Sequence, residues 1–211
     1  LILDLDGDEG VTLVGSGVSA WTSQTVGAFV AAQGTAGARP IVVPWGYGDH
    51  DAIRFDGVDD YMLIPHGAAL DLATLSIYVV CRFFETNGAG TLIPGAILGR
   101  SINGVESGNF MVWSIRSVTP TTLSARLDGV AASPAGAAFD WGVAAIWSLS
   151  IGAGSSAVRA GGRGVATAAA NSASYVSPQP VCLGALFYAA ASGFGGLDIA
   201  RLLLYSGQHT A

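Results

Sequence analysis

The sequence predicts an all-β fold, a sandwich or barrel of short antiparallel strands. Short apolar runs recur along the chain, and turn-forming residues, including 30 Gly and 8 Pro, separate them. No long stretch repeats its apolar residues with the period of a helix. Because no linker is long enough to divide the 211 residues, we expect a single domain over residues 1–211.

Individual strands are predicted where apolar, β-branched and aromatic residues lie between turn signals. The longest is Leu75–Phe84, which is apolar on nearly both faces and is therefore expected to be central and covered on both sides. The full set is Leu1–Leu5, Ala52–Phe55, Tyr61–Ile64, Leu75–Phe84, Ile97–Gly99, Phe110–Ile115, Thr122–Leu127, Val143–Ile151, Val181–Leu186 and Leu197–Tyr205.

The composition argues against two classes of partner. The nine basic residues are all Arg and are scattered, and the net charge is -6, so no basic patch is available to neutralise nucleic-acid phosphates. Mean hydropathy is high at +0.51, but the apolar runs are too short for the roughly 20-residue helix that spans a bilayer. We therefore expect neither nucleic-acid binding nor membrane insertion.

Several short segments resemble a known family in the same order along the chain. The most specific is the Ala52–Met62 segment AIRFDGVDDYM, in which Asp56-Gly57 predicts the turn of a hairpin. The others are Val18–Thr22, Ala38–Pro40, Leu75–Phe83, Ile97–Arg100, Leu183–Ala185 and Phe194–Tyr205. Together they resemble the laminin-G-like branch of the concanavalin-A-like lectin/glucanase superfamily. The resemblance implies a jelly-roll of two antiparallel sheets, with Arg201 where the family usually has Glu.

The residues predict no catalytic site. Glucanases of this superfamily carry their carboxylates as E-x-D-x-E on one strand, and Glu9, Glu85 and Glu106 do not form that pattern. The three histidines, His50, His66 and His209, lie beside turn residues and are interpreted as exposed loop residues. A glycoside hydrolase is therefore the least favoured of the functions considered, and we expect a protein that is not an enzyme.

Calcium is the one cofactor that the sequence suggests. Asp4, Asp6 and Asp8 lie within five residues, and Ca²⁺ prefers such hard carboxylate oxygens. The alternative is structural, because Asp4 and Asp6 alternate with Leu3 and Leu5 as on the solvent face of an edge strand.

The candidate ligand-binding segment is Trp45–Asp51. Trp45 and Tyr47 stand among glycines, and Asp49, His50 and Asp51 add polar groups, the combination that a sugar ring requires. The alternative is that the aromatic rings only cover one end of the sandwich.

The two cysteines, Cys81 and Cys182, lie in apolar strand-like runs. Buried free thiols are the favoured interpretation, and a disulfide is the alternative if the two strands are neighbours.

The function expected from these features is non-catalytic recognition or adhesion. The resemblance implies a carbohydrate- or surface-binding module on a phage virion, as a tail fibre or capsid decoration, or on a secreted bacterial protein. The expected partners are a glycan or host-surface receptor and other virion or surface subunits. The alternative is a purely structural assembly protein without a sugar ligand, motivated by the neutral surface expected of a chain with only 11% charged residues.

Overall fold

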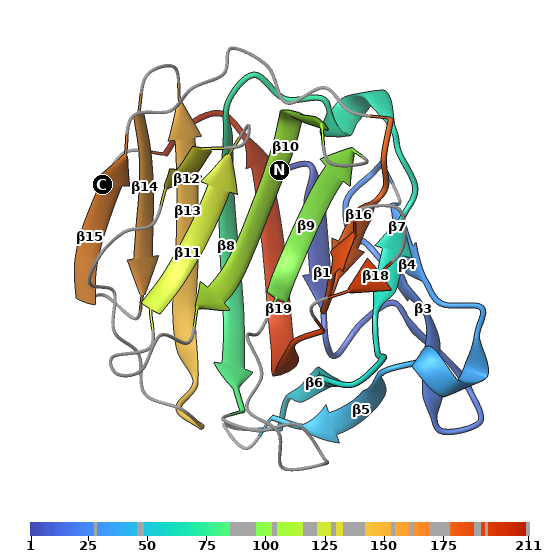
Figure 1. The fold of residues 1–211 in the computed structure, drawn as a ribbon. Helices are drawn as coiled ribbons and strands as arrows, with labels where there is room; N and C mark the ends of the chain where they lie inside the picture. Colours follow the sequence, from blue (N-terminus) through green and yellow to red (C-terminus); the bar gives the residue numbers. More distant parts are fainter. Residues whose placement is uncertain are drawn as a thin grey trace.

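The computed structural model confirms the all-β prediction. It describes residues 1–27, 29–45, 49–84, 96–102, 105–115, 122–127, 130–132, 142–152, 155–160, 163–168, 178–187, 191–192 and 194–209. Antiparallel strands dominate these ranges, and they pack as two facing layers (Figure 1). A single bridge between Gly17 and Ile41 links the layers, so that one hydrogen-bonded network curls into a sandwich.

The first layer, sheet 1, is built around the last long strand, β19, which pairs with both β1 and β8. Outward from β8 follow β13, β14 and β15, while β6 and then β5 pair beside the first half of β19. The bounds are β1 (Leu3–Asp6), β5 (Ile41–Pro44), β6 (Asp51–Asp56), β8 (Leu75–Phe83), β13 (Ala145–Gly152), β14 (Ser155–Ala160), β15 (Arg163–Ala168) and β19 (Gly196–Ser206).

The second layer, sheet 2, runs in the order β12, β11, β10, β9, β16, β7, β4, β3 and β2. Its strands are β2 (Val11–Val14), β3 (Gly17–Thr22), β4 (Val30–Ala32), β7 (Met62–Ile64), β9 (Ala96–Ile102), β10 (Val105–Ile115), β11 (Thr122–Leu127), β12 (Val130–Ala132) and β16 (Val181–Leu183). In Figure 1, β9, β10 and β11 overlie β8, β13 and β19 of sheet 1.

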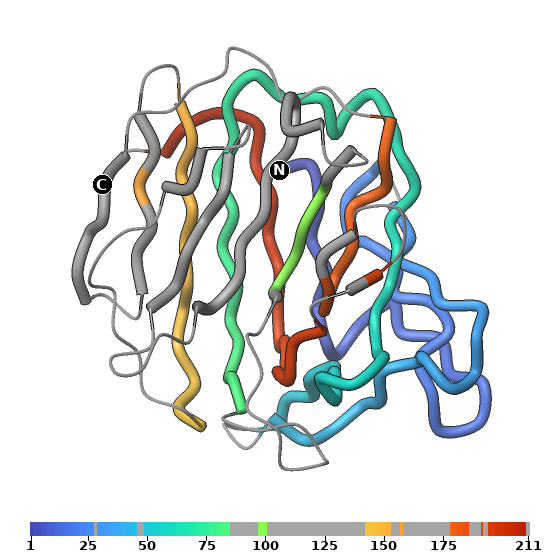
Figure 2. Tube along the Cα trace, in the orientation of Figure 1, coloured from blue at the N-terminus to red at the C-terminus, as the bar shows by residue number. Residues whose placement is uncertain are grey.

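The remaining elements are short. Two 3₁₀ turns, η1 (Ala36–Ala38) and η2 (Ala68–Leu70), interrupt the connections, and β17 (Leu186–Phe187) pairs with β18 (Ala191–Ser192) in a separate two-stranded sheet. Figure 2 shows β19 in red between β1 in blue and β8 in green, so strands from the first and the last part of the sequence are neighbours. No helix within the described ranges is long and apolar enough to cross a bilayer.

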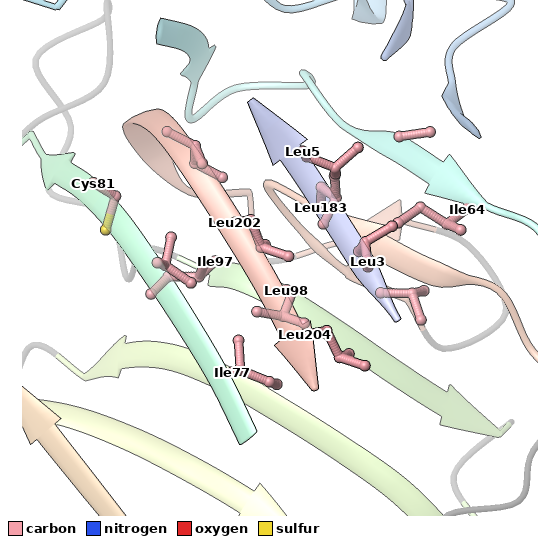
Figure 3. Close-up of a cluster of buried hydrophobic side chains, with 14 of the residues drawn as sticks. Leu3, Leu5, Ile64, Ile77, Cys81, Ile97, Leu98, Leu183, Leu202 and Leu204 are labelled. Atoms are coloured by element: carbon pink, nitrogen blue, oxygen red, sulfur yellow. The ribbon is translucent and has the colours of Figure 1, made fainter. Parts of the chain in front are cut away.

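The core fills the space between the two sheets. Figure 3 shows side chains of β1, β8 and β19 meeting those of β7, β9 and β16. The residues labelled there are all buried: Leu3, Leu5, Ile64, Ile77, Cys81, Ile97, Leu98, Leu183, Leu202 and Leu204. Cys81 and Cys182 are both buried free thiols, which confirms the favoured interpretation, and burial raises the pKa of Cys182 to about 12.

The predicted long strand is central, and among the described residues a second sheet covers one of its two sides. In β8, Ile77 and Val79 point into the core, and β13 and β19 pair on either side, as the sequence indicates. The opposite face carries Tyr78, Val80 and Arg82, which are half-buried rather than covered by a further layer. We call this side of β8 and its neighbours the outer face of sheet 1. It is apolar in places because same-face neighbours shield it, not because another sheet packs on it.

A β-bulge divides β19 and decides which of its side chains reach the outer face. Ile199 opposes Cys81 and Arg201 opposes Val80, so Ala200 is an extra residue between two consecutive pairs. The insertion shifts the alternation by one position. Leu197 and Ile199 point inward before it, and Leu202 and Leu204 point inward after it. Arg201, Leu203 and Tyr205 therefore lie on the outer face.

The Asp56-Gly57 turn forms as predicted, but it does not close a hairpin between paired strands. The Asp56 Oδ1 atom accepts the backbone N–H of Val58 at 2.8 Å, and Gly57 has a φ of 77°. However, β6 pairs with β5 and β19, whereas β7 pairs with β4 and β16. The turn therefore carries the chain from sheet 1 to sheet 2.

A second positive-φ glycine allows the two sheets to approach each other closely. Gly184, after β16, has a φ of 75°, and the Phe55 ring lies where a Cβ atom would stand. The Gly184 N–H donates to the Ile97 carbonyl at 2.9 Å, and its own carbonyl accepts from Gly195 at 2.7 Å. Glycine here meets a backbone requirement and a packing requirement together.

We expect Gly184→Ala to destabilise the fold more than Gly142→Ala. Gly142 has a similar φ of 72°, but nothing lies within 4 Å of its would-be Cβ. Gly142→Ala should cost about 1–2 kcal/mol for the left-handed backbone alone. Gly184→Ala should cost about 1–3 kcal/mol more, because the Phe55 ring must move. Urea unfolding of both variants measures the difference, and equal losses of stability would contradict the packing role.

Candidate functional site

An open depression of about 230 Å³ lies on the outer face of sheet 1. Its polar side chains come from β1 and the β1–β2 turn, from the end of the β5–β6 connection and the start of β6, and from β19. Its apolar side chains come from the β5–β6 connection, β8 and β19. The lining residues are Asp6, Asp8, Trp45, His50, Asp51, Val80, Ala200 and Arg201. The two separately predicted groups, the Asp4–Asp8 carboxylates and the Trp45–Asp51 segment, thus contribute to one site.

Asp8 holds the β5–β6 connection against the β1–β2 turn. Its Oδ1 atom accepts the backbone N–H of Asp51 at 2.7 Å, and its Oδ2 atom lies 2.5 Å from Nδ1 of His50. The backbone N–H of Trp45 donates to the His50 carbonyl at 2.8 Å, and this bond joins the two ends of the connection. These bonds set His50 and Asp51 at the rim, where the His50 side chain is 67% exposed.

Trp45 forms the floor of the depression. Its residue surface is only 5% exposed, and it packs with Val43 and Ala52 against the half-buried Val80 and Ala200. Most of the Trp45 ring therefore packs against the protein, as the alternative interpretation of this segment expects. What reaches the depression is an apolar surface beneath polar groups, the usual construction of a small-ligand site.

Arg201 forms the wall on the β19 side. Its Nε and Nη2 atoms donate to the two carboxylate oxygens of Asp4 at 3.0 and 2.9 Å, and Nη1 lies 3.4 Å from the Asp6 carboxylate. Although two carboxylates hold it, the Arg201 side chain remains 47% exposed. It is thus a fixed, solvent-accessible hydrogen-bond donor.

A buried ion network supports the floor from below. The Asp198 side chain is fully buried and accepts from Nε and Nη2 of Arg54 at 2.7 and 3.0 Å, and from Nη2 of Arg82 at 2.5 Å. The three residues are direct cross-strand partners on β6, β19 and β8. The Arg82 guanidinium lies 5.5 Å from the centre of the Trp45 ring, which fixes the tryptophan by a cation–π contact.

The charged groups at the rim hold each other in their ionised forms. The hydrogen bond from His50 and the N–H of Asp51 lower the pKa of Asp8 below its ordinary value. The same hydrogen bond, together with the Asp8 charge, raises the pKa of His50. Three carboxylates, those of Asp6, Asp8 and Asp51, share the depression with Arg201 and His50.

The predicted calcium ligands have protein partners in this structure. Asp4 and Asp6 face Arg201, and Asp8 faces His50 and Asp51. In the described part of the chain, the one group of three carboxylates with oxygens within 4.8 Å of one another is Asp56, Asp59 and Asp60. The calcium site at Asp4, Asp6 and Asp8 stays a prediction.

Those other three carboxylates belong to the β6–β7 turn, as the sequence indicates. Burial, with the nearby Asp56 carboxylate, raises the pKa of Asp60 to about 6. Asp60 also accepts the Asp56 N–H at 3.0 Å, which makes it part of the turn's own hydrogen bonding.

The predicted Trp45–Asp51 segment contributes to the depression, together with residues of β8 and β19 that the sequence did not indicate. Trp45, His50 and Asp51 line the depression, Asp49 is exposed beside it, and Tyr47 lies outside the described residues. Val80, Ala200 and Arg201 were not predicted. A signal for Arg201 existed, since the resemblance places Glu at that position, and the alternation of apolar residues breaks at Ala200-Arg201.

The comparisons with known proteins identify the fold alone. No family model and no curated protein sequence matches the chain. Among solved structures, a Trypanosoma rangeli sialidase is similar, with a TM-score of 0.62 and 14% identity over 99% of this chain. The chain spans 30% of the length of that sialidase.

Two similar solved structures are of a size closer to this chain. Domain 4 of AbnA, a GH43 extracellular arabinanase from Geobacillus stearothermophilus, in complex with arabinotriose, has a TM-score of 0.56 and 15% identity, covering 85% of this chain and 79% of its own. The Ruminococcus gnavus IT-sialidase CBM40 bound to alpha2,3 sialyllactose has a TM-score of 0.52 and 16% identity, covering 81% and 91%. Fold and depression thus define a jelly-roll β-sandwich with a candidate ligand site on one sheet.

Asp198→Asn should weaken the fold by about 3 kcal/mol, because it leaves Arg54 and Arg82 facing each other without their buried anion. Denaturant unfolding measures the loss. Asp59→Asn removes the same charge from an exposed position and should change stability by less than about 0.5 kcal/mol. A loss of similar size in both variants would show that the buried network has no special role.

The His50 imidazole should titrate above the usual histidine pKa, and Asp8→Asn should bring its pKa back toward that value. The physical reason is that protonated His50 is stabilised by an anionic partner, which the amide does not supply. NMR titration of the ring protons measures both values. Glu9→Gln, a neighbouring exposed charge, is the control and should leave most of the elevation in place. An unchanged His50 pKa in Asp8→Asn would contradict the pairing.

Proposed function

We propose that this chain is a non-catalytic carbohydrate-recognition module and that the depression on the outer face of sheet 1 is its ligand site. The observation that carries the proposal is the construction of the depression. Carboxylates, an imidazole and a guanidinium surround an apolar floor of Trp45, Val80 and Ala200. Protein partners hold the side chains of Asp6, Asp8, His50 and Arg201. Sugars present hydroxyl groups around apolar ring faces, and such a site matches both features.

The similar structures support the same class of ligand. The arabinanase domain was solved with arabinotriose and the CBM40 module with sialyllactose, so related sandwiches of comparable size bind sugars. The likeness extends to the fold and not to particular side chains, because identity is 15–16%. The ligand of this chain is therefore inferred from its own residues.

The charges in the depression favour a neutral sugar. Asp6, Asp8 and Asp51 supply three carboxylates, and Arg201 already shares its charge with Asp4. An anionic sugar entering the depression would approach these carboxylates, and like charges at close range are unfavourable. Neutral hydroxyl groups, in contrast, donate well to ionised carboxylates.

The state of Asp8 supports a binding role rather than hydrolysis. A glycosidase needs a carboxylic acid that is protonated near neutral pH, which requires a raised pKa. The pKa of Asp8 is lowered instead, because His50 and the Asp51 N–H stabilise its anion. Asp8 is thus suited to accept hydrogen bonds and not to donate a proton to a leaving group.

The wider setting is also part of the proposal. We assign the chain to the laminin-G-like branch of the concanavalin-A-like superfamily on the motifs that the sequence shares with it. Its place is then outside the cell, on a secreted bacterial protein or on a phage virion, where a glycan or host receptor and neighbouring subunits would be its partners.

Isothermal titration calorimetry against neutral oligosaccharides chosen from a glycan array tests the site. We expect the unaltered chain to bind a neutral glycan, and Asp51→Ala to weaken binding about 10–100-fold, because one hydrogen bond to a charged group is worth about 1.5–3 kcal/mol. Asp59→Ala, an equally exposed carboxylate on the β6–β7 turn, should leave the affinity unchanged.

Two outcomes would contradict the proposal. One is an array without neutral binders, and the other is equal affinity in the Asp51 and Asp59 variants. Stronger binding of sialylated than of neutral glycans would reject the neutral ligand while leaving sugar recognition in place.

A further inference from the structure

A group of aromatic side chains lies on the outer face of sheet 1, beyond the depression. Tyr78 of β8 and Tyr205 of β19 meet edge to face, with ring centres 5.9 Å apart. The His209 ring lies 4.7 Å from the Tyr205 ring, and its Nδ1 atom is 2.9 Å from the Tyr78 hydroxyl. Both tyrosines are half-buried and His209 is exposed, so each ring keeps surface for a ligand. We call these three residues the aromatic cluster.

The backbone that follows β19 holds the cluster in place. The His209 N–H donates to Oγ of Ser76 at 2.8 Å, and the His209 carbonyl accepts from Oγ of Ser150 at 2.8 Å. Ser76 also donates to the Gly207 carbonyl at 3.0 Å. These bonds fix the segment after β19 across β8 and β13, so the imidazole is a positioned group and not a free loop side chain.

The cluster and the depression share one continuous face. Arg201, which lines the depression, and Tyr205 lie on the same side of β19, four residues apart, because the bulge at Ala200 precedes both. Four residues of strand correspond to about 13 Å. Between them, Leu203 and its cross-strand partner Tyr78 are half-buried, and Ser148 lies opposite Tyr78 on β13.

We propose that the aromatic cluster is a second subsite, which binds a further sugar unit of an oligosaccharide whose first unit occupies the depression. The inference rests on the proposed function and specifies its ligand as a neutral chain of several units, lying along β8 and β19. Tyrosine rings offer flat apolar surface for the face of a sugar ring, and the Tyr78 hydroxyl and His209 imidazole offer hydrogen bonds at its edge.

The chemistry between the two subsites supports a sugar chain as the occupant. Leu203, Tyr78 and Ser148 carry no charge, and Asp4, which pairs with Leu203 on β1, is bonded through both carboxylate oxygens to Arg201. The path from Arg201 to Tyr205 therefore suits neutral hydroxyl and ring groups. Along β8, Val80 of the depression and Tyr78 of the cluster are two residues apart, about 7 Å, whereas Arg201 and Tyr205 on β19 are about 13 Å apart. A ligand that contacts both Arg201 and Tyr205 therefore needs more than one sugar unit.

Calorimetry with neutral linear oligosaccharides of increasing length tests the second subsite. The probes are glucose-, xylose-, arabinose- and galactose-based series of one to about six units. We expect affinity to rise with length, and Tyr205→Ala and His209→Ala each to remove about tenfold of that gain while binding of the shortest ligand is unchanged. Tyr205→Phe keeps the ring and should keep most of the gain.

The design separates this inference from the proposed function. Asp51→Ala should weaken short and long ligands alike, since it alters the depression. If affinity rises with length but Tyr205→Ala and His209→Ala bind every length like the unaltered chain, the second subsite is wrong and the depression stands. If no neutral sugar of any length binds, both are wrong. Because His209 is exposed, its variant tests the subsite even if Tyr205→Ala fails to fold.

Discussion

The outer face of sheet 1 depends on one buried carboxylate, that of Asp198. Two arginines on flanking strands share it, and a carboxylate without water is tolerated only when such partners satisfy it. The network joins β6, β19 and β8 at one level and directs Arg82 toward the Trp45 ring. The ion network therefore holds Trp45, the floor of the depression, through Arg82, and Asp8 holds the rim through His50 and Asp51.

The strands of sheet 1 serve the core and the surface at once. In β8, Ile77 and Val79 fill the interior, while Tyr78 and Val80 face the ligand side of the same strand. Strands that are held by the core thus position Val80, Ala200 and Arg201, while the β1–β2 turn and the β5–β6 connection add the other lining residues, among them Asp8, Trp45 and His50. Such a site is rigid, and rigidity reduces the ordering cost that a polar ligand would otherwise impose on binding.

The sequence predicts the strands far better than it predicts the site. Long runs such as Leu75–Phe83 are recognisable because they are continuously apolar, β-branched and aromatic, and Trp45, His50 and Asp51 are recognisable by their composition among glycines. Arg201 meets Asp4 and Asp6 only because β1 and β19 are neighbours in space, although 197 residues separate Arg201 from Asp4. Tertiary structure likewise determines that the Asp56 turn crosses between the sheets, and that the β5–β6 connection meets the β1–β2 turn. Local patterns carry no information about which distant strand pairs with which.

The bulge at Ala200 decides which side chains of the second half of β19 face the core and which face outward. Strand side chains alternate with a period of two, so the register before and after Ala200 differs by one step. A homologue of the same fold without this residue could keep a leucine-rich core, yet its surface would expose a different set of side chains. A relative that lacked one residue at this position would share the architecture but carry different side chains on the outer face of sheet 1.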